Sequence, residues 1–246
     1  MNYFLDTVDS IPSGLGFSAF GWQHLVWLGF GVIVTVLCSI WYRRAGDKGK
    51  DRWRKTVAIL LLLDEAFKVA MLCIGGRYTS SYLPLHLCSI NIFVIAIYSW
   101  KPSKVLSSFL YTVCIPGALA ALLFPTWTEL PFLNFMHLHS FTVHILLAMY
   151  PVVLVAGGTI RPSYKDIPQC LLLLVCMAIP IYFINLLLDT NFMFLMEADA
   201  GNPLALFEQL WGNHLLGFPV LIAAILAVMY LPLELYRKLH KVKTTA

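Results

Sequence analysis

Long hydrophobic stretches separated by short polar segments dominate the chain, and seven of them reach about 20 residues. That length covers a hydrocarbon core of about 30 Å when the residues are helical. In lipid every backbone N–H and C=O must be bonded within the chain, so we expect helices rather than open strands. The predicted fold is an all-α polytopic membrane helix bundle, a single integral membrane domain over residues 1–246. Its predicted spans are 22–42, 56–75, 82–100, 104–124, 135–156, 167–188 and 214–236.

Composition agrees with this class of protein, since 59% of the residues are hydrophobic and 12% are charged. Ordinary soluble domains are nearer 45 to 50% apolar. Proline removes one helical hydrogen bond and tends to kink a helix. Kinks are therefore predicted at the four prolines inside the spans, Pro116, Pro151, Pro180 and Pro219.

Basic residues collect on one side of the predicted membrane. They crowd the segment 43–55, lie at 101–104 and 161–165, and return at 237–243, whereas Arg77 is the one basic residue on the other side. The positive-inside rule then places the N-terminus outside and the C-terminus in the cytoplasm. These loops account for the net charge of +4 and can attract anionic lipid headgroups. Membrane lipid is thus the expected partner, with no nucleic acid; nothing in the sequence indicates an oligomeric state.

Six cysteines lie inside apolar spans, without a CxxC pair or a clustered metal-type spacing. We therefore expect no cofactor, and buried thiols are the simplest interpretation. Cys73 and Cys88 both lie in the outer halves of adjacent spans. A disulfide between them is an alternative if the outer side is oxidising.

The histidines follow the topology. Six of seven lie at or near the start of odd-numbered spans, so their side chains are predicted to gather near one membrane face. They are His24, His86, His137, His139, His144 and His214.

Three charged residues lie within the second span, where an ionisable group is costly and marks function by default. Asp64 and Glu65 are four and three residues before Lys68, so either carboxylate can pair with the ammonium. An ion pair that fixes helix packing and a functional role for Glu65 are both open.

Cys88 and Asn91 are three residues apart and share one face of the third span, whereas His86 points elsewhere on the same helix. His137 and His144 lie seven residues apart on one stripe of the fifth span. An imidazole from another helix can lower the pKa of a thiol and later act as a general acid. Cys88 with a histidine of the fifth span is therefore a candidate catalytic pair, the alternative being a small buried thiol.

Four strings carry a resemblance: PLHLCSINIF, PGALAALLFP, SFTVHILL and INLLLDTNFMFLM. With them the chain resembles the YwaF-type bacterial integral membrane proteins over nearly its whole length, and it is distantly similar to the vertebrate transmembrane protein 164 family. The first likeness implies a multi-pass protein of a bacterial plasma membrane, and the second a phospholipid acyltransferase.

By that resemblance Cys88 is the nucleophile, and His144 its partner, with His137 or His86 supporting. Substrate contacts are expected from Glu65, Asn91, Asn185 and Asn191. The chain departs from the bacterial pattern at Phe192, where a tyrosine is usual, and in the segment 211–214 before the last span.

The segment 189–213 combines an apolar patch at 192–195, a turn at 201–203 and a possible amphipathic helix at 204–211. It could cover a pocket that opens outward. The alternative is an ordinary interfacial loop anchored by aromatic residues.

Three functions stay open. The first is thiol-dependent acyl transfer or hydrolysis on lipid, with Asn91 or Asn185 steadying the oxyanion. The second is a metal-dependent hydrolase with His86, His137 and His144 as ligands and Glu65 or Asp189 as base. The third is a transporter or small-molecule receptor in which Glu65, Lys68 and the outer histidines line a path.

Overall fold

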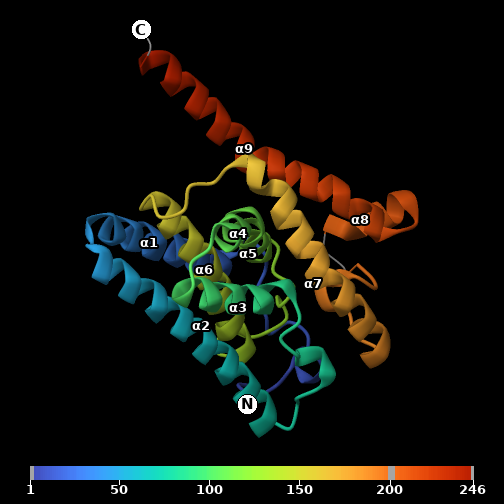
Figure 1. Ribbon diagram of the computed structural model, residues 1–246. Helices are drawn as coiled ribbons and strands as arrows, with labels where there is room; N and C mark the ends of the chain where they lie inside the picture. Colours follow the sequence, from blue (N-terminus) through green and yellow to red (C-terminus); the bar gives the residue numbers. More distant parts are fainter. Residues whose placement is uncertain (1–2, 199–202, 245–246) are drawn as a thin grey trace.

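A computed structural model describes residues 3–198 and 203–244, and every regular element in those ranges is a helix (Figure 1). The all-helical prediction is confirmed for this part of the chain. The α-helices are α1 (Trp22–Arg44), α2 (Asp47–Ile74), α3 (Leu87–Trp100), α4 (Lys104–Phe109), α5 (Ile115–Leu123), α6 (Phe135–Ala156), α7 (Ile167–Leu188), α8 (Pro203–Trp211) and α9 (Gly217–Thr244).

Helix α6 is the centre of the bundle. It packs against α1, α2, α3 and α5. In its most apolar 18-residue stretch 67% of the residues are buried, compared with 6% in the corresponding stretch of α1. The side chain of Asn134 caps its start by accepting hydrogen bonds from the backbone N–H groups of Met136 and His137. The Asn134 amide also donates to the carbonyl oxygens of Tyr3 and Asp6, which ties the N-terminal arm to this helix.

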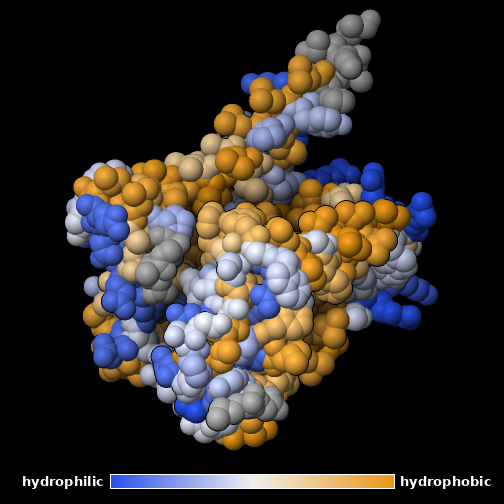
Figure 2. Space-filling view, turned by 180° about the vertical axis from the view of Figure 1, so that it is seen from behind, coloured by the Kyte–Doolittle hydropathy of each residue, from blue (hydrophilic) through white to orange (hydrophobic). Residues whose placement is uncertain are grey.

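Among the described residues, five helical segments are long and apolar enough to cross a membrane: Trp22–Arg44, Lys104–Leu123, Phe135–Ala156, Tyr164–Leu188 and His214–Leu239. Five of the seven predicted spans therefore meet this criterion. Helix α2 has 28 residues, but charged residues lower its apolar character. Figure 2 shows hydrophobic side chains over much of one face of the molecule, as expected of a surface that meets lipid.

The third predicted span is shorter than expected. Its helix, α3, has 14 residues and is about 21 Å long at 1.5 Å per residue. Pro84 restricts Leu83 to extended backbone, and His86 is also extended (φ −65°, ψ 150°). The prediction that residues 82–86 belong to this helix is therefore wrong.

Pro116 does not kink a regular helix as predicted. Residues Leu110–Cys114 form a π-helical segment between α4 and α5, and Pro116 lies in the first turn of α5. The widened turn accommodates a proline that has no N–H to donate. Pro219 likewise falls in the first turn of α9, where the missing donor costs little, while Pro151 and Pro180 lie inside α6 and α7.

Helices α7 and α9 lie at the edge of the bundle, and the end of α9 projects away from it (Figure 1). The hydroxyl of Tyr111 donates to the carbonyl of Met229, and Thr112 and Tyr230 share a hydrogen bond of 2.7 Å. These contacts attach α9 to the π-helical segment. The predicted amphipathic helix at 204–211 is confirmed as α8, whereas the predicted turn at Gly201 and Asn202 lies outside the described residues.

Candidate functional site

Cys88 lies in the first turn of α3, two residues after the extended residue His86. The prediction that His86 and Cys88 share one helix is wrong, because the helix begins between them. Backbone N–H groups at a helix start are unpaired, and they carry a partial positive charge that favours an anion. The helix start thus places backbone donors next to the Cys88 side chain. Cys73 and Cys88 are both free thiols, so the disulfide considered from the sequence is not formed.

His144 comes from α6 and faces Cys88 across the bundle. Its Nε2 lies 3.1 Å from the Cys88 Sγ, and its Nδ1 lies 2.6 Å from the carbonyl oxygen of Ser140. A carbonyl oxygen only accepts hydrogen bonds, so Nδ1 carries the proton in the neutral ring. The Nε2 lone pair is then directed at the thiol, which is the tautomer a general base requires.

Trp127 holds the His144 ring in place. The indole comes from the loop between α5 and α6 and stacks on the imidazole, with centroids 5.2 Å apart and planes 10° apart. It also packs edge-on against Phe141, 5.3 Å away and at 84°. Trp127 was not predicted as part of the site; the signal available was a tryptophan in the loop that directly precedes the span with His144.

The three charged residues in the middle of α2, Asp64, Glu65 and Lys68, form two separate pairs. Lys68 Nζ lies 2.5 Å from Glu65 Oε1, and both side chains are buried. Asp64 Oδ2 lies 2.8 Å from His139 Nδ1 of α6, although that contact is not aligned as a hydrogen bond. Of the two carboxylates considered for Lys68, Glu65 is the one that binds it.

Besides Asp64 Oδ2, two buried acceptors on α2 and α3 have no hydrogen-bond partner among the described residues, Oε2 of Glu65 and Oδ1 of Asn91. Asn91 lies one turn after Cys88 in α3. A buried polar group without a partner costs about 1–3 kcal/mol, so each is a candidate contact for a ligand that donates a hydrogen bond.

His137 has both ring nitrogens occupied by the protein. The indole N–H of Trp27 donates to Nε2 at 3.1 Å, and Nδ1 lies 3.3 Å from the carbonyl oxygen of Leu130. His137 thereby connects α1, α6 and the preceding loop. His86 instead packs edge-on against Phe192, with ring centroids 5.1 Å apart.

Asn185 and Asn191 organise the loop after α7. Asn185 accepts hydrogen bonds from the N–H of Phe192 and the hydroxyl of Thr190, and donates to the carbonyl of Phe192. Asn191 bonds to the backbone of Met196 and Glu197 in the same way. These contacts fix Phe192, which is buried, against His86 at the start of α3.

The remaining outer histidines are buried in the protein. His24 accepts a hydrogen bond from the N–H of Phe20 and lies 2.6 Å from the carbonyl of Leu122. His214 Nε2 lies 3.1 Å from the carbonyl of Phe194. The side chains of His24, His139 and His214 are all buried in the protein, and the prediction that the outer histidines gather near one membrane face stays a prediction.

Within the described residues, no group of three or more His, Cys, Asp and Glu side chains could hold a metal ion. The set of His86, His137 and His144 is not assembled, because the first packs on Phe192 and the second is bonded to Trp27 and Leu130.

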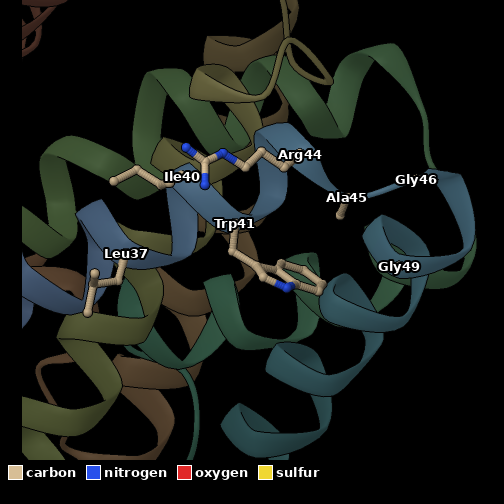
Figure 3. Close-up of a pocket in the computed structure, with 7 residues that line it drawn as sticks. All are labelled: Leu37, Ile40, Trp41, Arg44, Ala45, Gly46 and Gly49. Carbon is tan, nitrogen blue, oxygen red and sulfur yellow. The ribbon is translucent and has the colours of Figure 1, made fainter.

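A groove of about 420 Å³ lies elsewhere, where α1 ends and α2 begins (Figure 3). It is lined by Leu37, Ile40, Trp41, Arg44, Ala45, Gly46 and Gly49. None of these residues is a nucleophile or a general base. The groove is therefore separate in chemistry and position from Cys88 and His144.

These features define a helical membrane protein in which a thiol and an imidazole from different helices meet. A sequence comparison identifies the family: the TMEM164 family matches residues 19–230, and the chain belongs to it. No curated protein and no solved structure matches the chain. The resemblance to the YwaF-type bacterial proteins stays a prediction.

Proposed function

We propose that this protein is a thiol-dependent acyltransferase or hydrolase that acts on ester bonds of membrane lipids. The observation that carries the proposal is the 3.1 Å contact between Cys88 Sγ and His144 Nε2. The hydrogen bond from His144 Nδ1 to the Ser140 carbonyl supports it, since it directs the basic nitrogen at the thiol.

In the first half of the reaction, His144 Nε2 takes the thiol proton and Sγ attacks the ester carbonyl of the lipid. The tetrahedral intermediate breaks its C–O bond, and the protonated His144 gives its proton to the departing alkoxide. The products are a thioester on Cys88 and a lipid alcohol. The unpaired N–H groups at the start of α3 and the side-chain amide of Asn91 are the proposed donors to the oxyanion.

In the second half, an alcohol or water loses a proton to His144 and attacks the thioester. Cys88 leaves as a thiolate and recovers its proton from His144. A lipid alcohol gives acyl transfer, and water gives hydrolysis. Glu65 is the proposed contact for a donor group of the substrate, because its free oxygen is buried without a partner.

The test uses purified protein in liposomes of 1-palmitoyl-2-oleoyl-phosphatidylcholine with deuterated lysophosphatidylcholine as acceptor. Mass spectrometry follows the appearance of diacyl lipid that carries the label. We expect Cys88→Ala to reduce exchange and release of fatty acid to the rate without protein. Cys176→Ala, an exposed thiol on α7, is the matched control. Exchange that continues unchanged in Cys88→Ala would overturn the proposal.

We also propose the seven-span topology, with the N-terminus outside and a bacterial plasma membrane as location. The uneven distribution of basic residues supports it. Single cysteines are placed at positions 13, 103 and 163 of a variant without other cysteines. Maleimide labelling of intact cells then shows which of these positions face the outside of the membrane. Labelling at 13 alone is expected; labelling at 103 from outside contradicts the topology.

A further inference from the structure

We propose that the groove between α1 and α2 is a binding site for one anionic phospholipid of the membrane, independent of the chemistry at Cys88. The groove has an apolar wall from α1 and a cationic residue, Arg44, at its polar end (Figure 3). A phospholipid has the matching arrangement, an acyl chain next to a negatively charged headgroup.

The apolar wall consists of Leu37, Ile40 and Trp41, whose side chains are 45 to 61% exposed. Two of the remaining lining residues, Gly46 and Gly49, have no side chain, and this leaves the space open. A Cβ at position 49 would lie 3.8 Å from Cη2 of Trp41, so the indole lies next to the start of α2 and a larger side chain at position 49 would occupy groove space. Figure 3 shows Trp41 reaching toward α2 while Arg44 folds back along α1. An acyl chain fits this geometry, since tryptophan favours the boundary between headgroups and chains.

Charge distribution decides which headgroup fits. Between residues 43 and 55 the chain has seven basic residues and two aspartates. The Asp51 carboxylate is already bonded to Lys55 and Arg54, which lower its pKa below the usual value. Lys50 lies 5.6 Å above the Tyr42 ring. Asp51 is thus engaged by other cations and does not neutralise Arg44.

Arg44 itself has no hydrogen bond or ion pair among the described residues. A planar guanidinium binds phosphate through two parallel N–H groups. In a zwitterionic headgroup the ammonium group partly neutralises the phosphate charge, whereas an anionic headgroup keeps that charge. The groove therefore favours an anionic phospholipid over a zwitterionic one of the same chain length.

The experiment is native mass spectrometry of the delipidated full-length protein titrated with dioleoyl-phosphatidylglycerol or dioleoyl-phosphatidylcholine. We expect the first phosphatidylglycerol to bind about tenfold more tightly than phosphatidylcholine, as one charge-assisted contact of about 1.4 kcal/mol would give. Arg44→Ala should remove this preference, and Arg44→Lys should retain part of it. Gly49→Leu fills the groove without a change of charge and should weaken binding of both lipids.

Arg43→Ala is the matched control, because Arg43 is the adjacent residue with the same charge and does not line the groove. It should keep the wild-type preference. An equal loss of the preference for phosphatidylglycerol in Arg43→Ala and Arg44→Ala would show general attraction to a basic surface. Equal affinity of the wild type for both lipids would show that the groove does not select an anionic lipid. Either result overturns the proposal. Circular dichroism of each variant excludes unfolding as the cause. Acyl exchange by Cys88 has no part in this measurement, so the proposed activity and the lipid site fail separately.

Discussion

At the scale of residues, the arrangement around Cys88 depends on a few directed contacts. His144 is oriented from two sides, by the Ser140 carbonyl at Nδ1 and by the Trp127 indole on its face. A base held in this way loses little entropy when it meets the thiol, which is how preorganised sites gain rate.

Replacing His144 with alanine should slow the alkylation of Cys88 by iodoacetamide about tenfold or more, because the thiol loses the base that stabilises its thiolate. His137→Ala is the matched control from the same helix face and should leave the rate unchanged, since His137 bonds to Trp27 and Leu130. Stopped-flow or mass-spectrometric alkylation rates decide. A larger effect in His137→Ala than in His144→Ala would show that His144 is not the base.

Substitution of Trp127 separates ring stacking from other roles. Trp127→Ala removes a buried aromatic residue and should destabilise the protein by about 3–5 kcal/mol and lower acyl exchange. Trp127→Phe keeps a ring against His144 and should retain most of the activity. Thermal unfolding measures the effect on stability, and initial rates measure the effect on acyl exchange. If Trp127→Phe loses as much exchange as Trp127→Ala, stacking on His144 does not account for the role of Trp127.

At the scale of elements, the loop after α7 brings the end of that helix to the start of α3, where Cys88 lies. The loop after α7 is held by Asn185, so that Phe192 packs on His86 immediately before α3. Three residues of this segment have positive φ, Asp189, Met193 and Phe194. Such conformations cost about 1–3 kcal/mol each and persist because the surrounding contacts hold them.

Asn185→Ala should release this loop. The buried N–H of Phe192 loses its acceptor, at a cost of about 1–3 kcal/mol. Hydrogen exchange of residues 190–197 should accelerate, while exchange in α6 stays at the wild-type rate. Asn191→Ala removes bonds at the exposed end of the same loop and should have a smaller effect. Unchanged exchange in Asn185→Ala would contradict this account.

The pair of Glu65 and Lys68 on α2 gives a second prediction at this scale. Glu65→Gln leaves the buried ammonium without its counter-charge and should cost about 3–5 kcal/mol. The exchanged pair, Glu65→Lys with Lys68→Glu, should recover most of the stability if the role is structural. A proton-flux measurement in liposomes tests the transport alternative: flux that requires Glu65 and is not restored by the exchanged pair would favour transport.

At the scale of the whole molecule, α6 is the helix on which α1, α2, α3 and α5 assemble. Its end receives Tyr42 of α1, a fully buried residue whose hydroxyl lies 3.1 Å from Oγ1 of Thr159. The ring packs against Gly157, where an added Cβ would overlap it, with Cε1 at 2.8 Å. This close approach fixes α1, which is otherwise largely exposed, against the core.

Gly157→Ala should therefore lower the midpoint of thermal unfolding, because Tyr42 must move and its hydrogen bond is lost. Gly29→Ala in α1 is the matched control, since its Cβ would have nothing within 4 Å. It should leave stability unchanged or raise it slightly, as alanine favours helix over glycine by about 1 kcal/mol. Equal midpoints for the two variants would show that the contact between Tyr42 and Gly157 is dispensable.

Hydrophobic periodicity and length determined most of the elements. The predicted span 135–156 coincides with α6 and 167–188 with α7, because a backbone in lipid must satisfy its own hydrogen bonds and the apolar stretch itself sets where this is required. The start of α3 could not be located by length alone, since Leu83 and Leu85 extend the apolar stretch; Pro84, which restricts the residue before it to extended backbone, was the available signal.

The sequence predicted that Cys88 meets a histidine of the fifth span, and the role of the pair in chemistry stays a prediction. The sequence offered Cys88 and three histidines as a partner, and a distance across two helices distinguishes His144 from His137 and His86. Spacing along one helix determines which residues share a face, but the rotation of α3 against α6 is set by side-chain packing over the whole interface. The groove at Arg44 lies within residues 37–49, and its shape depends on how α2 leaves the end of α1. The contact of Cys88 with His144 and the stacking of Trp127 on His144 join residues of different elements, so tertiary structure decided them.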